Sequence, residues 1–157
     1  RKVVLTAQEE IDEPDSNTLK GMRFLCAEDN ELNAEILMEL LKIEGAECII
    51  CENGERVLEA FEQSAPGYYD MILMDVQMPV MNGYDATRAI RRSTHELAKT
   101  IPIIAMTANA FSEDIQYSLA AGMNAHISKP VDMKPLEKTI RRIKIGGRGT
   151  ETQAIEQ

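Results

Sequence analysis

Acidic, hydroxyl and ammonium side chains follow four apolar segments of this 157-residue sequence, at the point where each segment ends. Glu28 and Asp29 follow the first segment, and Asp75 follows one that is apolar throughout. Thr107 and Lys129 follow two later segments. If these segments are strands of one parallel sheet, their carboxyl ends share an edge. We therefore expect three carboxylates in one crevice, faced by a hydroxyl and an ammonium.

Three neighbouring carboxylates repel one another unless a cation offsets their charge. Mg²⁺ suits such a site because it prefers oxygen ligands and keeps several of its waters. We expect Asp29 and Asp75 to bind the ion directly and Glu28 to act through water, with Mn²⁺ as a possible substitute. The backbone carbonyl of Gln77 is a candidate for a further oxygen ligand.

The same residues suit phosphoryl transfer. A carboxylate can act as a nucleophile and form an aspartyl phosphate. Phosphorylation of Asp75 would add negative charge and three acceptor oxygens, which the metal ion, the Lys129 ammonium and the Thr107 hydroxyl can bind. Each residue alone also has an ordinary structural explanation, such as a loop acid or a surface lysine. Their joint placement at successive strand ends supports the chemical interpretation.

Strand-like and helix-like segments alternate between residues 22 and 144. Apolar runs predict strands, and apolar residues three and four apart after a capping residue predict helices. Strands are predicted at 23–27, 47–51, 71–74, 101–106 and 125–128, and helices after Asn30, Asn53 and Asn82, at 113–121, and from Asp132 to about Ile143. Strict alternation predicts an α/β protein with a doubly wound parallel sheet that helices cover on both faces.

The two ends of the chain differ from this body. Residues 1–21 are rich in acids and predict a linker or N-terminal extension, and residues 145–157 are rich in glycine and predict a flexible tail. Residues 22–144 are then one domain. The chain does not begin with Met, which suggests a piece of a longer protein.

Charge and hydropathy limit the partners. Seventeen Lys and Arg against 26 Asp and Glu give a net charge of −9, which repels nucleic acids and anionic lipids at long range. A basic cluster of Lys138, Arg141, Arg142 and Lys144 is only local. No apolar run approaches the ~18 residues that span a bilayer. We expect no nucleic-acid or membrane contact by this chain.

The three cysteines are too few for a disulfide framework. Cys48 and Cys51 match a C-x-x-C motif, but they lie in a predicted strand, where odd spacing places two side chains on opposite faces. A redox motif normally opens a helix. Buried, reduced thiols are therefore favoured over redox chemistry, and a cytoplasmic location is expected.

Four segments together resemble the response-regulator receiver domain of two-component signalling. They are Glu28–Asn30, Asp75–Gly83, Thr107–Ala108 and Lys129–Pro130, and the similarity extends over about residues 22–142. The Met-Pro-Val-Met sequence within the second segment resembles receivers of hybrid sensor histidine kinases, and the parent chain of such a receiver can be membrane-anchored. The resemblance implies a flavodoxin-like (βα)5 three-layer sandwich with sheet order 2-1-3-4-5.

The resemblance also implies a role for each residue of the crevice. Asp75 is the phosphoacceptor, and Glu28 and Asp29 hold Mg²⁺. Thr107 is the switch hydroxyl, and Lys129 senses the phosphate. A phosphohistidine on a histidine kinase dimerisation domain, or on a histidine phosphotransfer protein, is the donor.

Further positions follow from the same resemblance. The peptide bond between Lys129 and Pro130 is expected to be cis. His126 stands three residues before the lysine, where the family often has an aromatic switch residue, so it is either a pH-sensitive switch or a histidine with no role. Gln77 and Asn109 flank the site and are expected to tune the access of water.

Phosphorylation is expected to bias the surface formed by the fourth helix, fifth strand and fifth helix between two states. A second docking face is expected at an exposed apolar edge of the first helix, near Leu37 and Leu41. The fragment would catalyse only its own phosphorylation and dephosphorylation, as a monomer or weak homodimer. It contains no histidine kinase motifs.

Three other functions remain open. A small phosphatase that forms an aspartyl phosphate usually has a second acid two residues after the nucleophile, where this chain has Gln77. A flavodoxin-like flavin carrier needs a phosphate loop that Glu28 and Asp29 would repel. A degenerate receiver that only binds proteins would not need the complete set of site residues.

Overall fold

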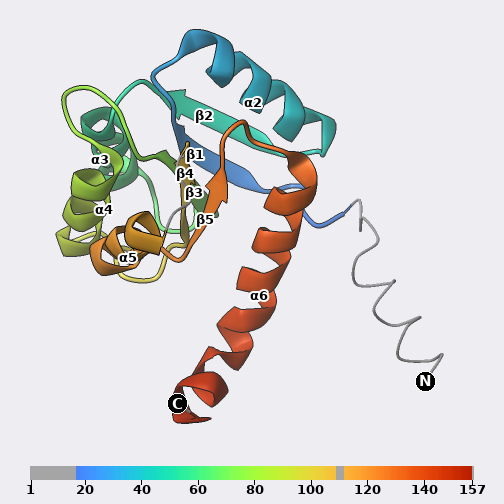
Figure 1. Cartoon of the computed structure of the whole chain (residues 1–157), viewed down its shortest axis with the longest axis vertical. Helices are drawn as coiled ribbons and strands as arrows, with labels where there is room; N and C mark the ends of the chain where they lie inside the picture. The colour runs from blue at the N-terminus through green and yellow to red at the C-terminus, as the bar shows by residue number, and fades with distance from the viewer. Residues whose placement is uncertain (1–16, 109–111, 157) are drawn as a thin grey trace.

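The computed structural model describes residues 17–108 and 112–156 and contains one five-stranded parallel sheet between two layers of helices (Figure 1). The strands are β1 (Arg23–Ala27), β2 (Glu47–Cys51), β3 (Met71–Asp75), β4 (Ile103–Thr107) and β5 (Ala125–Ser128). The helices are α2 (Glu31–Ile43), α3 (Gly54–Gln63), α4 (Gly83–Arg92), α5 (Ser112–Ala121) and α6 (Met133–Glu156). The sheet order is β2-β1-β3-β4-β5, which confirms the predicted flavodoxin-like fold.

Asparagine begins each of the helices that follow the first three strands. The side chains of Asn30, Asn53 and Asn82 accept hydrogen bonds from backbone N–H groups three residues later, at 2.9, 2.9 and 2.8 Å. Each bond satisfies a donor that the first helical turn leaves without a partner. The three turns at the carboxyl edge of the sheet are therefore held by the same local device.

The core has one cluster on each face of the sheet. Leu25, Ile72 and Ile103 are aligned across three neighbouring strands and pack against α3 and α4. The alternate residues of the same strands, such as Leu73 and Ile104, pack against α2 and α6. All five residues of β3 and of β4 are buried, so these two strands form the centre of the molecule.

The cysteines follow the predicted alternation. Cys48 packs against the cluster on the α2 and α6 face, and Cys51 packs against the cluster on the opposite face. All three cysteines are free thiols, with Cys26 buried and the other two half-buried. Burial raises the pKa of Cys26 and of Cys51, which favours their protonated forms.

The predicted docking edge on the first helix is wrong. Leu37 and Leu41 are 3% and 0% exposed and belong to the core, whereas Leu32 and Ile36 are 64% and 49% exposed. A step of one residue turns a helix by about 100°, so Ile36 lies beside the buried row rather than in it. The exposed apolar surface of α2 is therefore formed by Leu32 and Ile36, not by Leu37 and Leu41.

Both ends of the body extend further than predicted. α6 continues to Glu156 rather than ending near Ile143, because no proline interrupts the chain after the glycines and the helix is already nucleated upstream. At the other end Leu19 is buried in the core, within the predicted linker. Residues 1–16 of that linker lie outside the described residues.

In the part of the chain that the structure describes, no helix combines the length and apolar character needed to span a bilayer.

Candidate functional site

The predicted site residues converge at the carboxyl edge of the sheet. Glu28 follows β1, Asp75 and Thr107 end β3 and β4, and Lys129 follows β5. Because β1, β3, β4 and β5 are hydrogen-bonded neighbours in that order, these ends lie side by side. They share a cavity of about 260 Å³ that is lined by Glu28, Asp29, Asn30, Asn33, Asp75, Val76, Gln77, Thr107, Ala108 and Lys129.

Three carboxylates form the acidic cluster of this cavity. Oxygen atoms of Glu28, Asp29 and Asp75 all lie within 4.8 Å of one another. Glu28 and Asp75 are buried, whereas Asp29 is exposed. Hard oxygen donors at this spacing, one of them open to solvent, suit a Mg²⁺ ion that keeps part of its water shell. The donor set therefore fits a magnesium site.

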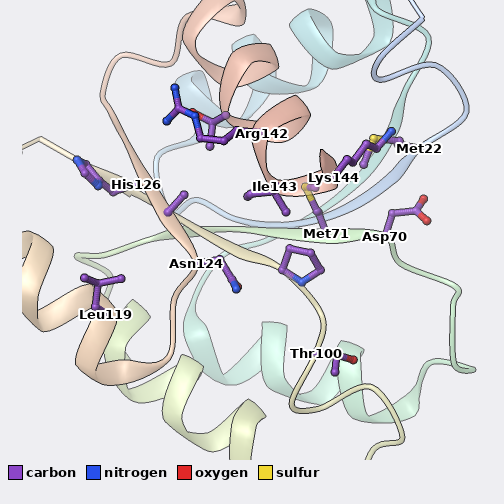
Figure 2. A pocket seen from close by; sticks show the side chains of 13 residues that line it. Met22, Asp70, Met71, Thr100, Leu119, Asn124, His126, Arg142, Ile143 and Lys144 are labelled. Atoms are coloured by element: carbon purple, nitrogen blue, oxygen red, sulfur yellow. The ribbon is translucent and has the colours of Figure 1, made fainter. Parts of the chain in front are cut away.

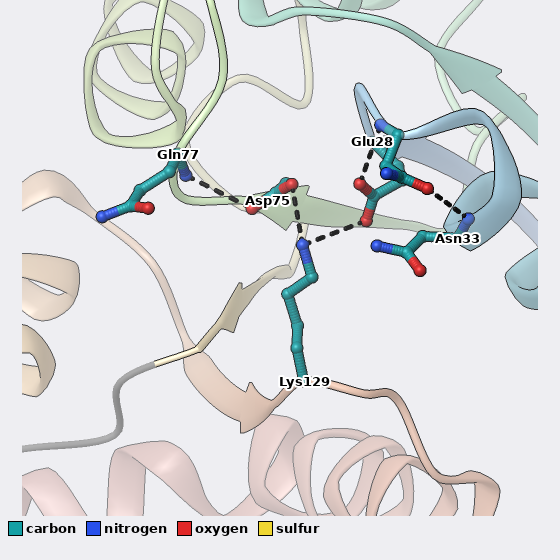
Figure 3. Close-up of polar contacts among 6 residues, drawn as sticks. Glu28, Asn33, Asp75, Gln77 and Lys129 are labelled. Atoms are coloured by element: carbon teal, nitrogen blue, oxygen red, sulfur yellow. Dashed lines mark hydrogen bonds and ion pairs between the residues drawn. The ribbon is translucent and has the colours of Figure 1, made fainter.

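Lys129 connects the two buried carboxylates (Figure 3). Its Nζ lies 3.0 Å from Oδ2 of Asp75 and 3.3 Å from Oε1 of Glu28. Burial alone lowers the pKa of Lys129, but the hydrogen bonds and charges of the two acids outweigh burial and raise it. The ammonium is thus held in its charged form and partly offsets the charge of the acids.

The carboxyl of Asp75 is held at both oxygens. Oδ1 accepts a hydrogen bond from the backbone N–H of Gln77 at 3.2 Å, and Oδ2 accepts one from Lys129 at 3.0 Å (Figure 3). Burial raises the pKa of Asp75 to about 6, the bond to Lys129 lowers it, and the charge of Glu28 raises it. Asp75 is therefore an oriented carboxylate that protonates unusually easily.

The turn after β3 requires glycine at position 83. Gly83 donates its N–H to the carbonyl of Val76 at 2.9 Å. A Cβ at Gly83 would lie 2.4 Å from the Asp75 carbonyl oxygen and 2.9 Å from Cγ of Met74. The chain can pack this closely behind Asp75 only without a side chain at this position. The sequence predicted a helix after Asn82 but gave no sign of this close approach at Gly83.

Asn33 is a lining residue that the sequence analysis missed. It lies in the first turn of α2 and lines both the acidic cavity and an adjoining apolar cavity. The available signal was its position three residues after the Asn30 cap, which places it beside the end of β1. An amide at this point can orient a bound water or a phosphoryl oxygen.

The remaining predicted site residues lie in several different parts of the structure. The peptide bond between Lys129 and Pro130 is cis, as the resemblance implied. Thr107 is buried at the end of β4, and its carbonyl accepts a hydrogen bond from the N–H of Lys129 at 2.8 Å. His126 is half-buried on β5 and lines a different cavity. Asn109 lies outside the described residues.

The cavity that His126 lines is larger than the acidic cavity, at about 970 Å³, and its lining residues are of different types (Figure 2). It lies beside the residues that begin β3, β4 and β5, and α6 covers it. Asp70 is the one carboxylate among its described lining residues, and Oδ2 of Asp70 already accepts a hydrogen bond from the N–H of Arg23 at 2.8 Å. The smaller, acidic cavity is therefore the one equipped for metal and phosphate chemistry.

Comparison with known proteins agrees with this geometry. The family model described as "Response regulator receiver domain" matches residues 24–141. Hybrid signal transduction histidine kinase G of Dictyostelium discoideum is 40% identical over 124 residues, which cover 77% of this chain and 4% of that protein. This chain therefore spans a small part of the relative that it matches.

Two solved structures are similar over most of the chain. The receiver domain of sensor histidine kinase PA1611 from Pseudomonas aeruginosa PAO1, with a magnesium ion coordinated in its active site cleft, is 36% identical with a TM-score of 0.69. The alignment covers 78% of this chain and 96% of that one. The co-crystal structure of the Saccharomyces cerevisiae phosphotransfer protein Ypd1 with the receiver domain of Ssk1 matches at 27% identity and a TM-score of 0.68, covering 79% and 89%.

The family match over residues 24–141 covers most of the chain and includes the acidic cluster and Lys129. The chain belongs to the response regulator receiver domain family.

Proposed function

We propose that this chain is a magnesium-dependent phosphoacceptor that takes a phosphoryl group onto Asp75. The observation that carries the proposal is the convergence of three carboxylates within 4.8 Å beside the Lys129 ammonium. Asp29, Asp75 and the backbone carbonyl of Gln77 would hold Mg²⁺, with Glu28 acting through water and Mn²⁺ as a substitute. The ion, when bound, offsets negative charge on the phosphoryl oxygens.

The transfer itself forms one bond and breaks one. An oxygen of Asp75 attacks the phosphorus of a phosphohistidine, the phosphorus–nitrogen bond breaks, and the imidazole leaves with the electron pair and takes up a proton. The Gln77 N–H and the Lys129 ammonium orient the attacking carboxylate at 3.2 and 3.0 Å. Attack requires the unprotonated carboxylate, which dominates above the pKa of about 6.

Lys129 and Thr107 would then bind the phosphoryl group on Asp75. The ammonium that pairs with Asp75 in this structure can bind a phosphoryl oxygen instead, and the Thr107 hydroxyl at the end of β4 can bind another. These changes would shift the population between two arrangements of α5, β5 and α6. His126 on β5 is the candidate for a second switch residue.

Dephosphorylation returns the chain to its starting state. Water attacks the aspartyl phosphate and regenerates the Asp75 carboxylate and free phosphate. Gln77 and Asn109 would control the access of that water. The chain would in this sense catalyse only its own phosphorylation and dephosphorylation. Its parent would be a hybrid histidine kinase with this domain in the cytoplasm. The domain itself would be a monomer or a weak homodimer.

The partner is a phosphohistidine-bearing helix of a kinase or of a phosphotransfer protein. The complex of Ypd1 with the Ssk1 receiver domain supports this class of partner. Here an apolar cavity of about 340 Å³ adjoins the acidic one and is lined by Ile36, Leu37, Pro130 and Val131 among others. Ile36, which lines this cavity, is exposed on α2, and Leu32 is exposed one helical turn earlier. This rim offers apolar area to a helix that delivers its histidine to Asp75.

A small-molecule phosphodonor tests the proposal without a partner. We expect acetyl phosphate with Mg²⁺ to label the wild-type chain and beryllofluoride to mimic that label, and we expect Asp75→Asn to abolish both. Asp85→Asn, which changes an exposed aspartate on α4, is the matched control and should label like the wild type. Equal labelling of Asp75→Asn and wild type, measured by intact mass, would remove Asp75 from its role.

A further inference from the structure

Positive charge is concentrated on one side of α6. Between Met133 and Ile145 the helix has five cations and one anion, in a chain whose net charge is −9. The cations are Lys134, Lys138, Arg141, Arg142 and Lys144, here called the basic face of α6. At about 100° per residue they occupy one half of the helix, and the core residues Leu136 and Ile140 occupy the other.

The chain enters the domain on this same helix. The carbonyl of Thr18 accepts a hydrogen bond from Nζ of Lys144 at 2.9 Å, and its hydroxyl accepts one from Arg141 at 3.4 Å. The next residue, Leu19, is buried in the cluster that contains Leu136. Thr18 is therefore held against the basic face.

The residues just before this entry point have the opposite charge. Residues 9–15 contain five carboxylates and no cation: Glu9, Glu10, Asp12, Glu13 and Asp15. Thr18 comes three residues after Asp15, and three extended residues reach about 10 Å. The rise of α6 from Lys134 to Arg141 is also about 10 Å. A cavity of about 360 Å³ lies along this stretch and is lined by Lys134, Pro135, Glu137, Lys138 and Arg141.

We propose that residues 9–15 dock on the basic face of α6 of the same chain. Each exposed ion pair contributes only about 0.2–1 kcal/mol, but the tether at Thr18 gives the segment an effective concentration on the order of millimolar. Several weak pairs then suffice to keep it bound at low salt. The docked segment sets the direction from which the preceding part of a longer chain approaches the receiver, along α6.

Zero-length carbodiimide crosslinking of the whole chain tests this directly, because it joins a lysine to a carboxylate only in contact. We expect peptides that join Lys134 or Lys138 to residues 9–15, identified by mass spectrometry. Their yield should fall severalfold between about 20 mM and 0.5 M salt, since exposed pairs are screened. A control with Lys42→Glu, an exposed cation in the last turn of α2, should keep the crosslinks.

Charge reversal on either partner separates docking from loss of the reactive amine. Arg142→Glu leaves both lysines in place and should lower the yield of crosslinks. Asp12→Lys with Glu13→Lys, in the otherwise wild-type chain, should also lower the yield from the remaining acids, because the charge of residues 9–15 falls from −5 to −1. Circular dichroism confirms that each variant is folded. The proposal fails if no such crosslink forms at low salt, if salt does not change the yield, or if mixed labelled and unlabelled copies show that the crosslinks join two chains.

Discussion

The ammonium of Lys129 lies 3.0 Å from the carboxylate of Asp75, although 54 residues separate them in the chain. Both residues line the acidic cavity, and the same ammonium lies 3.3 Å from Glu28. Two carboxylates that are 3% and 4% exposed at their side chains thus share one cation. Without a metal ion, Lys129 is the group that makes their burial tolerable.

Replacing Lys129 should therefore destabilise the metal-free domain. We expect Lys129→Met to lower the free energy of unfolding at neutral pH by roughly 2 kcal/mol, because it leaves two buried carboxylates without their cation. Added Mg²⁺ should recover part of the loss, since it offsets the same charges. Thermal unfolding with and without Mg²⁺ measures both effects. Lys42→Met, at an exposed position, should change stability by less than about 0.5 kcal/mol.

Magnesium affinity should fall in acid as Asp75 takes up a proton. The pKa of Asp75 is raised from 3.8 to about 6, so at pH 5 only about a tenth of the carboxyls are ionised. We expect the affinity for Mg²⁺ to drop about tenfold between pH 7.5 and pH 5, as measured by calorimetric titration. In Asp75→Asn the weaker remaining binding should vary much less over this range. An equal pH dependence in both proteins would contradict the assignment.

The same pKa shift makes a prediction for stability. Between about pH 4 and pH 6 the folded domain holds a proton on Asp75 that the unfolded chain has released. The contribution of Asp75 to the free energy of unfolding therefore falls as the pH rises through this window and stays constant above it. We expect Asp75→Asn to be more stable than the wild type at pH 7.5, by on the order of 1–2 kcal/mol. Urea unfolding at pH 4 and pH 7.5 compares the two.

The sequence was most informative where local chemistry decides the structure. The bounds of β2 and β5 were predicted correctly, because turn residues on both sides of each segment limit where the strand can begin and end. The convergence of Asp75 and Lys129 followed from the geometry of parallel sheets, in which strand ends meet at one edge. An acid, a hydroxyl or a lysine in that position is visible in the sequence.

Features that depend on packing between elements were harder to predict. Leu32, Ile36, Leu37 and Leu41 are all apolar, and only the position of α2 on the sheet determines which pair is buried. The end of α6 was placed too early because glycine lowers helix propensity without forbidding the helix. The close contact of Gly83 behind Asp75 depends on a loop path that no local pattern encodes.

Adding a methyl group at Gly83 should disturb the site through the backbone. The new Cβ would lie 2.4 Å from the Asp75 carbonyl oxygen, and backbone atoms cannot yield as a side chain can. We expect Gly83→Ala to destabilise the domain by about 2 kcal/mol or more and to slow phosphorylation by acetyl phosphate. Gly67→Ala is the control, because no atom lies within 4 Å of its Cβ position and only its φ of +87° is unfavourable. It should cost about 1 kcal/mol and leave phosphorylation unchanged.

The exposed apolar rim of α2 should matter only when a protein delivers the phosphoryl group. Ile36 is 49% exposed and lines the apolar cavity that adjoins the acidic one, whereas Ile43 is 75% exposed at the last position of the same helix. We expect Ile36→Glu to slow transfer from a phosphorylated phosphotransfer protein at least tenfold, because a charge would be buried against an apolar partner surface. Labelling by acetyl phosphate should stay unchanged, since that small donor needs no docking surface. Ile43→Glu adds the same charge outside the rim and should affect neither reaction. If both variants slow protein-mediated transfer alike, net charge rather than docking explains the effect.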